Sequence, residues 1–296
     1  MTTNQIAKAP RPPTFLGIGS QNCGTTWATA CLAQHPDIFI PDRKEISYFD
    51  VDYYRGWDWY LSYFAIPENY SAWGEWSPGY ICRDQAFERV TKQLENIRVI
   101  ALFRNPVDRL FSHYWRFRAE GATHKPLLQA IDSNKEFIRM SLYADDWGKW
   151  LRHYGNDNCH AMIFEDLLRN PLAEYKKLFS FLGVDAAFEP DLEAAKQRQN
   201  AIQLNRRQWL MDGVAYCRTS LQKLGLSPLV GFAKRVGVRK LLKSMAQPSS
   251  NGYRGKSLTL SERQMLYEKY FENDVTKLEM LLGNRDLSIW SPTETP

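Results

Sequence analysis

The stretch that most constrains the fold of this chain is residues 14–26, which read TFLGIGSQNCGTT. Residues 15–19 form an apolar run typical of a buried strand, and residues 20–24 form a small-residue turn bracketed by glycine. The next residues, TTWATACL, have the spacing of a helix that begins at Thr25. A strand that leads through such a turn into a helix presents free backbone N–H groups and the positive end of the helix dipole. The pattern therefore predicts a phosphate-binding loop, although glycines that serve only the geometry of the turn would give the same pattern.

The turn departs at one position from the nucleotide-binding pattern G-x-x-x-x-G-K-[ST]. Gly19 and Gly24 occupy the glycine positions and Thr26 the Ser/Thr position, but Thr25 stands where the pattern has lysine. Without that lysine little charge remains to neutralise β- and γ-phosphates, which disfavours an ATPase or a kinase. A P-loop nucleotide kinase stays an alternative, which ATP turnover with Mg²⁺ would support.

Strand and helix patterns alternate along the chain. Further strands are predicted at residues 37–41, 74–78, 98–104 and 159–164, and further helices at residues 107–119 and from Pro171 onward. The aromatic-rich residues 53–80 favour a helix packed on the core. The alternation predicts an α/β fold in which helices flank a central parallel sheet in a P-loop-like three-layer arrangement, with an added helical cap.

The length of 296 residues fits one domain, which we place at residues 14–296, after a polar, proline-rich flexible arm at residues 1–13. Residues 196–250 are polar and basic, and they are predicted to form the cap or lid. A basic amphipathic helix on a membrane surface is the alternative for that segment. Residues 261–282 predict one amphipathic helix with Ser261 as its N-cap.

The composition limits which kinds of ligand and partner we expect for this chain. The net charge of +5 fits an anionic small ligand better than a nucleic acid, and no Arg/Lys block resembles a nucleic-acid footprint. The five cysteines are scattered without C-x-x-C or Cys/His spacing, which disfavours zinc and a disulfide framework. No signal-peptide pattern and no apolar run of about 18 residues is present, so we expect a cytoplasmic protein without a membrane span.

A second anion site is predicted at the end of the strand at residues 98–104. Arg104 ends that strand, and Ser112 lies two turns into the following helix. In an open α/β sheet, strand ends and helix starts meet at the edge where ligands bind. An arginine fork and a hydroxyl there suit a phosphate, although a salt bridge and an ordinary surface serine would explain the same residues.

Five motifs occur in a fixed order along the chain: GIGSQNCGTTW, KEISYFD, GEWSPGY, RVIALFRNPVDRLFSHYWRF and NGYRGKSLTLSERQMLYEKYFENDVTKLEMLLG. Together they resemble the sulfotransferases that depend on 3′-phosphoadenosine 5′-phosphosulfate (PAPS). The branch that they resemble most includes heparan-type enzymes and bacterial small-molecule sulfotransferases, some of them in natural-product biosynthesis. The resemblance covers nearly the whole chain.

The resemblance implies transfer of a sulfuryl group from PAPS to a hydroxyl or amine of a small molecule, without a metal. Glu45 matches the general base, and Tyr48 and Trp76 fall where acceptor contacts are expected. The implied donor contacts are Gln21, Asn22, Cys23, Gly24, Thr25, Thr26 and Trp27 at the 5′ end, Arg104 and Ser112 at the 3′-phosphate, and Tyr253, Arg254, Gly255 and Lys256 over the adenosine.

The chain departs from the family pattern at three positions. Asn22 replaces the loop lysine, Trp76 replaces a second lysine, and Ser47 stands where histidine is frequent. One explanation is that Lys44, Arg254 or Lys256 reaches the phosphosulfate and compensates. A second is a cationic acceptor held by cation–π contact with Trp76 near Tyr48. A third is a PAPS-binding protein with impaired turnover. The sequence leaves open the acceptor, the choice between oxygen and nitrogen, and the oligomeric state.

Overall fold

The computed structural model describes residues 10–66, 69–196 and 257–292. Within these residues five strands form one parallel sheet in the order β2-β3-β1-β4-β5. The strands are β1 (Phe15–Gly19), β2 (Ile38–Phe39), β3 (Ala72–Trp76), β4 (Arg98–Phe103) and β5 (Cys159–Ile163). The predicted parallel sheet is therefore confirmed, with strand ends within two residues of those expected.

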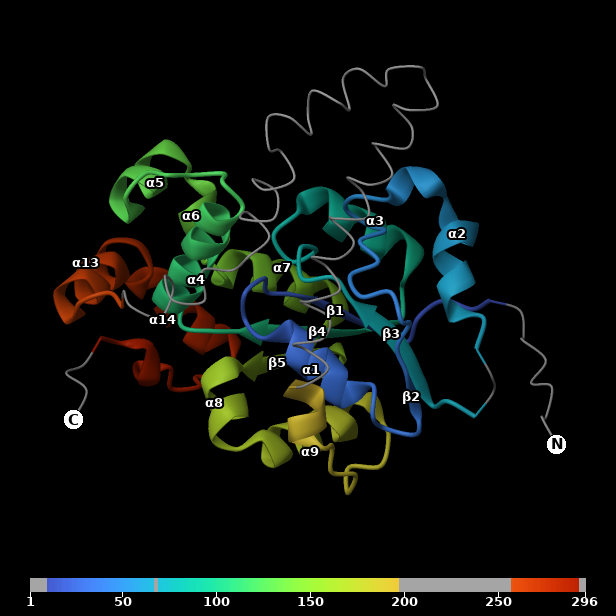
Figure 1. Cartoon of the computed structure of the whole chain (residues 1–296). Helices are drawn as coiled ribbons and strands as arrows, with labels where there is room; N and C mark the ends of the chain where they lie inside the picture. Colours follow the sequence, from blue (N-terminus) through green and yellow to red (C-terminus); the bar gives the residue numbers. More distant parts are fainter. Residues whose placement is uncertain (1–9, 67–68, 197–256, 293–296) are drawn as a thin grey trace, which may run out of the picture. The chain divides into compact units, whose positions relative to one another are not determined.

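Helices cover both faces of the sheet. Figure 1 shows α1, α8 and α9 on one face and α3 and α7 on the other. The chain runs from β1 toward β2 in one direction and from β3 toward β5 in the other, so right-handed crossovers place α1 opposite α3 and α7. The helices are α1 (Thr25–Leu32), α2 (Trp57–Leu61), α3 (Asp84–Gln93), α4 (Pro106–Ala119), α5 (Leu127–Ser133), α6 (Glu136–Arg139), α7 (Ala144–Tyr154), α8 (Phe164–Arg169), α9 (Pro171–Leu182), α13 (Leu260–Tyr270) and α14 (Glu272–Leu281), with 3-10 turns η1 (Tyr53–Arg55), η2 (Ser62–Phe64), η3 (Asn156–Asn158) and η4 (Ser288–Trp290).

The central strands are apolar because both of their faces are covered. Every residue of β1 is buried, as is every residue of β4 after Arg98. Parallel strands end at the same edge of a sheet. This edge therefore gathers the turn after β1, the segment after β3 and Arg104 after β4.

Three local predictions are corrected. Residues 261–282 form two helices, α13 and α14, which meet at the buried side chain of Phe271. The N-cap is Thr259 and not Ser261, because Thr259 and Glu262 form a reciprocal capping box. The aromatic stretch from Tyr53 to Phe64 forms three short turns, η1, α2 and η2, instead of one long helix.

The chain divides into two compact units, one of residues 1–192 with 258–296 and the other of residues 193–257. Apart from Lys196, the predicted cap lies outside the described residues, and so do Tyr253, Arg254, Gly255 and Lys256. The end of the predicted arm packs on β3, since the Trp73 indole donates to the Pro12 carbonyl at 2.7 Å. Among the described residues, no helix has the length and apolar character needed to span a membrane.

Candidate functional site

The turn after β1 is shaped by Gly24. Its φ of 89° lies in the left-handed region, and a Cβ at this position would come within 2.5 Å of the Phe164 ring. Only glycine satisfies both conditions, so the tight entry into α1 depends on it. The turn ends with Thr25 and Thr26 in the first turn of α1, as the sequence predicts.

The start of α1 fits an anion. No side chain caps the helix, and its first turn contains no acidic residue. In the turn itself, Ser20 Oγ and Asn22 Nδ2 are buried and have no hydrogen-bond partner among the described residues. Buried polar groups normally have partners, so this arrangement of unpaired groups suits a bound phosphate or phosphosulfate oxygen.

A lysine and a carboxylate lie beside α1. Lys44 Nζ donates a hydrogen bond to Thr26 Oγ1 and lies 3.2 Å from Glu45 Oε1. The two side chains are 23% and 38% exposed, so both are reachable by a ligand. Glu45 and Ser47 have φ values of 56° and 55°, which is unfavourable for residues other than glycine. The loop therefore presents a cation and a base candidate together at the helix start.

Arg104 joins the two predicted anion sites. Its Nη1 donates to the Asn22 carbonyl at 3.2 Å, and its guanidinium lies 5.0 Å from the centre of the Phe164 ring. No carboxylate of the described residues pairs with it, so this part of the chain offers no support for the salt-bridge explanation. Asn105 fixes the strand end by capping α4, through bonds to the N–H groups of Val107 (3.0 Å) and Asp108 (3.3 Å). Ser112 lies on α4, half-buried.

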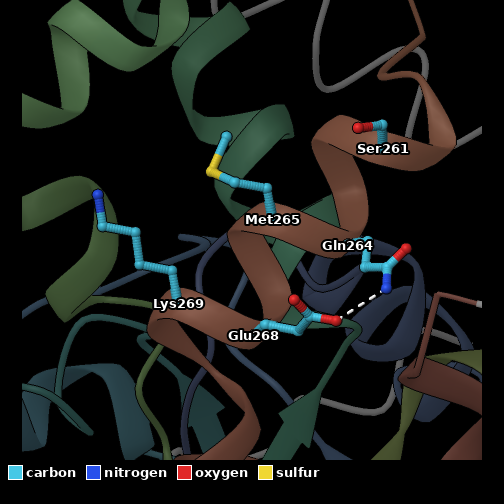
Figure 2. A pocket seen from close by; sticks show the side chains of 5 residues that line it. All are labelled: Ser261, Gln264, Met265, Glu268 and Lys269. Atoms are coloured by element: carbon cyan, nitrogen blue, oxygen red, sulfur yellow. Dashed lines mark hydrogen bonds between the residues drawn. The ribbon is translucent and has the colours of Figure 1, made fainter.

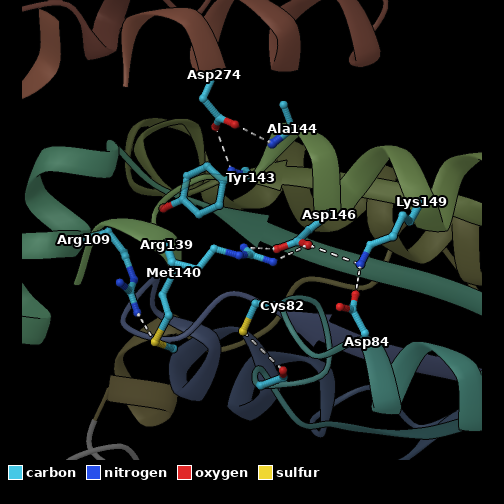
Figure 3. A network of polar contacts seen from close by, with 11 residues as sticks. Cys82, Asp84, Arg109, Arg139, Met140, Tyr143, Ala144, Asp146, Lys149 and Asp274 are labelled. Carbon is cyan, nitrogen blue, oxygen red and sulfur yellow. Dashed lines mark hydrogen bonds and ion pairs between the residues drawn. The ribbon is translucent and has the colours of Figure 1, made fainter. Parts of the chain in front are cut away.

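Tyr143 contacts residues of both predicted anion sites. Its hydroxyl donates to the Arg104 carbonyl at 3.0 Å and lies 3.9 Å from Cys23 Sγ. Figure 3 shows that the Asp274 carboxylate accepts the N–H groups of Tyr143 (2.7 Å) and Ala144 (3.1 Å), where α7 begins. Sequence reasoning missed Tyr143 because its partners Arg104 and Cys23 lie about 40 and 120 positions away along the chain.

A buried arginine lies under the turn. Arg109 is fully buried and donates from Nε to the Gln21 carbonyl at 3.1 Å. Its other partners are neutral: Ser141 Oγ at 3.2 Å, His113 Nδ1 at 2.8 Å and Met140 Sδ at 3.7 Å. Burial lowers the pKa of His113 to about 3, so the imidazole is uncharged. Arg109 thus places a positive charge beneath the turn without a carboxylate partner among the described residues.

Four residues predicted to contact ligands turn their side chains into the protein. Trp76 is 2% exposed and donates from its indole to the Gly19 carbonyl at 3.0 Å, while Tyr48 is 1% exposed and stacks on Tyr60. The side chain of Cys23 faces Tyr143, and the indole of Trp27 faces the Leu192 carbonyl. The rings of Trp76 and Tyr48 are both packed inside the protein, and their predicted contact with an acceptor stays a prediction.

Close to the loop of Lys44 and Glu45 lies a second carboxyl group, Glu75, which unlike Glu45 is buried. Glu75 on β3 is 1% exposed, and its two oxygens are hydrogen-bonded to Ser77 Oγ (2.7 Å) and the Tyr80 hydroxyl (2.9 Å). Burial raises the pKa of Glu75 from 4.5 to about 8, so the group is largely neutral at pH 7.

A surface hollow lies apart from the predicted site residues. A hollow of about 450 Å³ runs along α13 (Figure 2); its lining, which includes none of the predicted site residues, is Ser261, Gln264, Met265, Glu268 and Lys269. In the described part of the chain, no group of three or more His, Cys, Asp or Glu side chains is arranged to hold a metal ion.

Comparison with known proteins identifies the fold and the family. The sulfotransferase domain family matches residues 12–210, about two thirds of the chain. The chain belongs to this family. A solved sulfotransferase from Alicyclobacillus acidocaldarius has the same fold, with a TM-score of 0.68 and 22% identity over 95% of this chain and 99% of that one.

Curated relatives of this sulfotransferase-family chain match it over only part of their own length. The human bifunctional heparan sulfate N-deacetylase/N-sulfotransferase 2 is 28% identical over 59% of this chain and 22% of the relative. The mouse heparan sulfate glucosamine 3-O-sulfotransferase 5 is 24% identical over 58% of this chain and 54% of the relative. The membrane-associated sulfotransferase kil1 of Dictyostelium discoideum is 37% identical over 34% of this chain and 22% of the relative. The chain thus matches between about a fifth and about half of the length of these curated relatives.

Proposed function

We propose that this chain transfers a sulfuryl group from PAPS to a hydroxyl or amine of a small-molecule acceptor, with Glu45 as the general base. Membership of the sulfotransferase family supports the reaction type. The arrangement around the start of α1 supports the residue roles. Of the three explanations for the missing loop lysine, the proposal adopts compensation by Lys44.

The observation that carries this proposal is the position of Lys44. Its ammonium group bonds Thr26 Oγ1 in the first turn of α1 and also contacts Glu45 Oε1. A charged hydrogen bond is worth roughly 1.5–3 kcal/mol, against about 1 kcal/mol for a neutral one. Lys44 therefore restores at α1 the positive charge that Asn22 does not bring.

The donor is proposed to lie across two anion sites. The start of α1, with Ser20, Asn22 and Thr26, would hold the 5′-phosphosulfate through helix N–H groups and unpaired polar side chains. Arg104 and Ser112 would hold the 3′-phosphate. Arg109 adds positive charge under the turn, which lowers the energy of an anion bound above it. The proposed contacts of Tyr253, Arg254, Gly255 and Lys256 lie outside the described residues.

PAPS supplies the activated sulfuryl group, and the protein supplies alignment and charge. Sulfuryl transfer resembles phosphoryl transfer, so positioning and stabilisation of charge should provide most of the rate enhancement. Glu45 Oε2 would accept the proton of the acceptor hydroxyl or amine, while Oε1 remains near Lys44. Lys44 Nζ would stabilise negative charge that develops on the leaving phosphate oxygens.

The acceptor stays open between oxygen and nitrogen. A cationic acceptor held on the faces of Trp76 and Tyr48 finds no support in the geometry, because both rings are buried. Glu45, whose side chain is 38% exposed, still provides a carboxylate for either kind of nucleophile.

The test is release of adenosine 3′,5′-bisphosphate from PAPS by the purified chain with a panel of hydroxyl and amine acceptors. Glu45→Gln should lower kcat by about 10²–10⁴-fold. Lys177→Met is the control, because Lys177 also pairs with a glutamate, Glu174, but on α9; its rate should stay unchanged. Tight bisphosphate binding without release for any acceptor would favour the binding protein with impaired turnover. Hydrolysis of ATP with Mg²⁺, but not of PAPS, would favour the kinase.

A further inference from the structure

The loop that carries Glu45 is connected through two hydroxyl groups to a buried carboxyl group, Glu75, which is not among the proposed donor contacts. The Ser47 N–H donates to Ser77 Oγ at 2.9 Å, and the Phe49 N–H approaches the Tyr80 hydroxyl at 3.4 Å. Both hydroxyls in turn are hydrogen-bonded to Glu75, at 2.7 and 2.9 Å. Two backbone groups of the loop are thus connected to one side chain on β3.

The conformation of the loop needs such support. Glu45 and Ser47 both adopt left-handed φ values, which persist in non-glycine residues only where the surroundings enforce them. Ile46 and Phe49 are fully buried and anchor the loop by packing. Packing of these apolar side chains does not determine how the intervening backbone is turned, whereas directed hydrogen bonds at residues 47 and 49 do.

We propose that Glu75 is a positioning residue, which orients the hydroxyls of Ser77 and Tyr80 so that they hold the Glu45 loop in its reactive geometry. The protonated carboxyl group offers one donor and one acceptor, so it fixes the rotation of both hydroxyls and keeps a lone pair of each directed toward the loop N–H groups. Without Glu75 both hydroxyls are free to rotate, and the two bonds to the loop weaken. The inference rests on the proposed role of Glu45 as the base.

Apart from Tyr80, the titratable groups that face Glu75 do not bond the N–H groups of Ser47 and Phe49. The Phe49 carbonyl is held separately, by Arg89 Nη1 at 2.8 Å, and this bond does not involve Glu75. The charged or titratable groups that face it are Asp50, Glu45, Tyr60 and Tyr80. Asp50 and Glu45 carry like charges and contact Arg83 and Lys44, respectively. The Tyr60 hydroxyl is buried without a partner among the described residues. Burial keeps Glu75 protonated near neutral pH, so a glutamine should replace it well.

The test compares Glu75→Ala with Glu75→Gln. Glu75→Ala should lower kcat by about 10–100-fold, since small misplacements of a catalytic group have effects of this size. Glu75→Gln should recover kcat to within about threefold, because an amide preserves one donor and one acceptor. Affinity for adenosine 3′,5′-bisphosphate should be equal in both variants and the parent. An unchanged kcat in Glu75→Ala, or a loss of nucleotide affinity that matches the loss of kcat, would overturn the proposal.

Amide hydrogen exchange provides a readout that does not depend on turnover. The amides of Ser47 and Phe49 should exchange faster in Glu75→Ala and in Ser77→Ala. The Ser77→Ala variant provides the test if Glu75→Ala does not fold. Tyr154→Phe is the control, since it removes another buried tyrosine hydroxyl, bonded to the Leu94 carbonyl at 2.8 Å. If the parent shows no transfer, the proposed function fails, and exchange still decides whether Glu75 holds the loop. Unaltered exchange at both amides would refute that role.

Discussion

Replacement of Glu75 by glutamine should change how the stability of the protein depends on pH. Burial raises the pKa of this carboxyl group from 4.5 in an ordinary setting to about 8 in the fold. Between these values the folded state retains a proton that the unfolded state has released. Stability therefore falls as pH rises, and the contribution that is complete below pH 4.5 is lost on passing pH 8.

The magnitude follows from the same two values. Each pH unit between them lowers the free energy of unfolding by about 1.4 kcal/mol. From pH 5 to pH 7, Glu75 should therefore remove about 2.5 kcal/mol, which is a large share of the 5–15 kcal/mol roughly typical of a folded domain. Because Glu75 is 1% exposed, little solvent screening reduces this effect.

The assay is urea unfolding followed by tryptophan fluorescence at pH 5, 6, 7 and 8. The quantity of interest is the free energy of unfolding of the parent minus that of Glu75→Gln, because other titrating groups cancel in the difference. This difference should fall by about 2.5 kcal/mol between pH 5 and pH 7, because only the parent loses the contribution of Glu75. A difference that stays constant over the whole range would show that Glu75 does not hold its proton in the fold, and the reasoning from burial would be refuted.

Two further predictions concern the anion sites. Lys44→Met should lower kcat by about 10–100-fold, equivalent to one charged hydrogen bond, and Asn22→Lys in that background should restore part of it; an unchanged rate in Lys44→Met would contradict its role. Tyr143→Phe should lower both the free energy of unfolding and the affinity for adenosine 3′,5′-bisphosphate, because the hydroxyl supports the Arg104 carbonyl. Tyr154→Phe should lower only the free energy of unfolding, and calorimetric titration of both variants distinguishes these outcomes.

The sequence predicted the elements whose signal is local. The apolar run before Ser20 and the run between Arg98 and Arg104 become β1 and β4, because short apolar segments in a parallel sheet are buried on both faces. The resemblance to sulfotransferases and the α/β fold are confirmed. The prediction of Ser261 as N-cap was wrong, because Thr259 and Glu262 form the capping box and the helix begins at Leu260.

Long-range contacts explain what the sequence could not provide. Trp76 replaces a lysine and was expected to bind an acceptor, yet the missing side chain of Gly17 leaves the space that its indole fills. The bond between Lys44 and Thr26 joins residues 18 positions apart and has no local signal. The partners of Glu75 could be recognised as polar residues, but their connection to the backbone of the Glu45 loop depends on the fold.

The central claim is that two anion sites hold the two ends of one adenine nucleotide. Calorimetric titration of adenosine 3′,5′-bisphosphate and AMP into the parent and Arg104→Ala tests it most directly. Arg98→Ala is the matched control, since Arg98 begins β4, at the opposite end from Arg104, and bonds the Leu182 carbonyl at 3.0 Å. The account predicts that the parent and the control bind the bisphosphate at least about tenfold more tightly than AMP, and that Arg104→Ala loses this preference. Equal affinity of the parent for both nucleotides, or a preference that survives in Arg104→Ala, would contradict it.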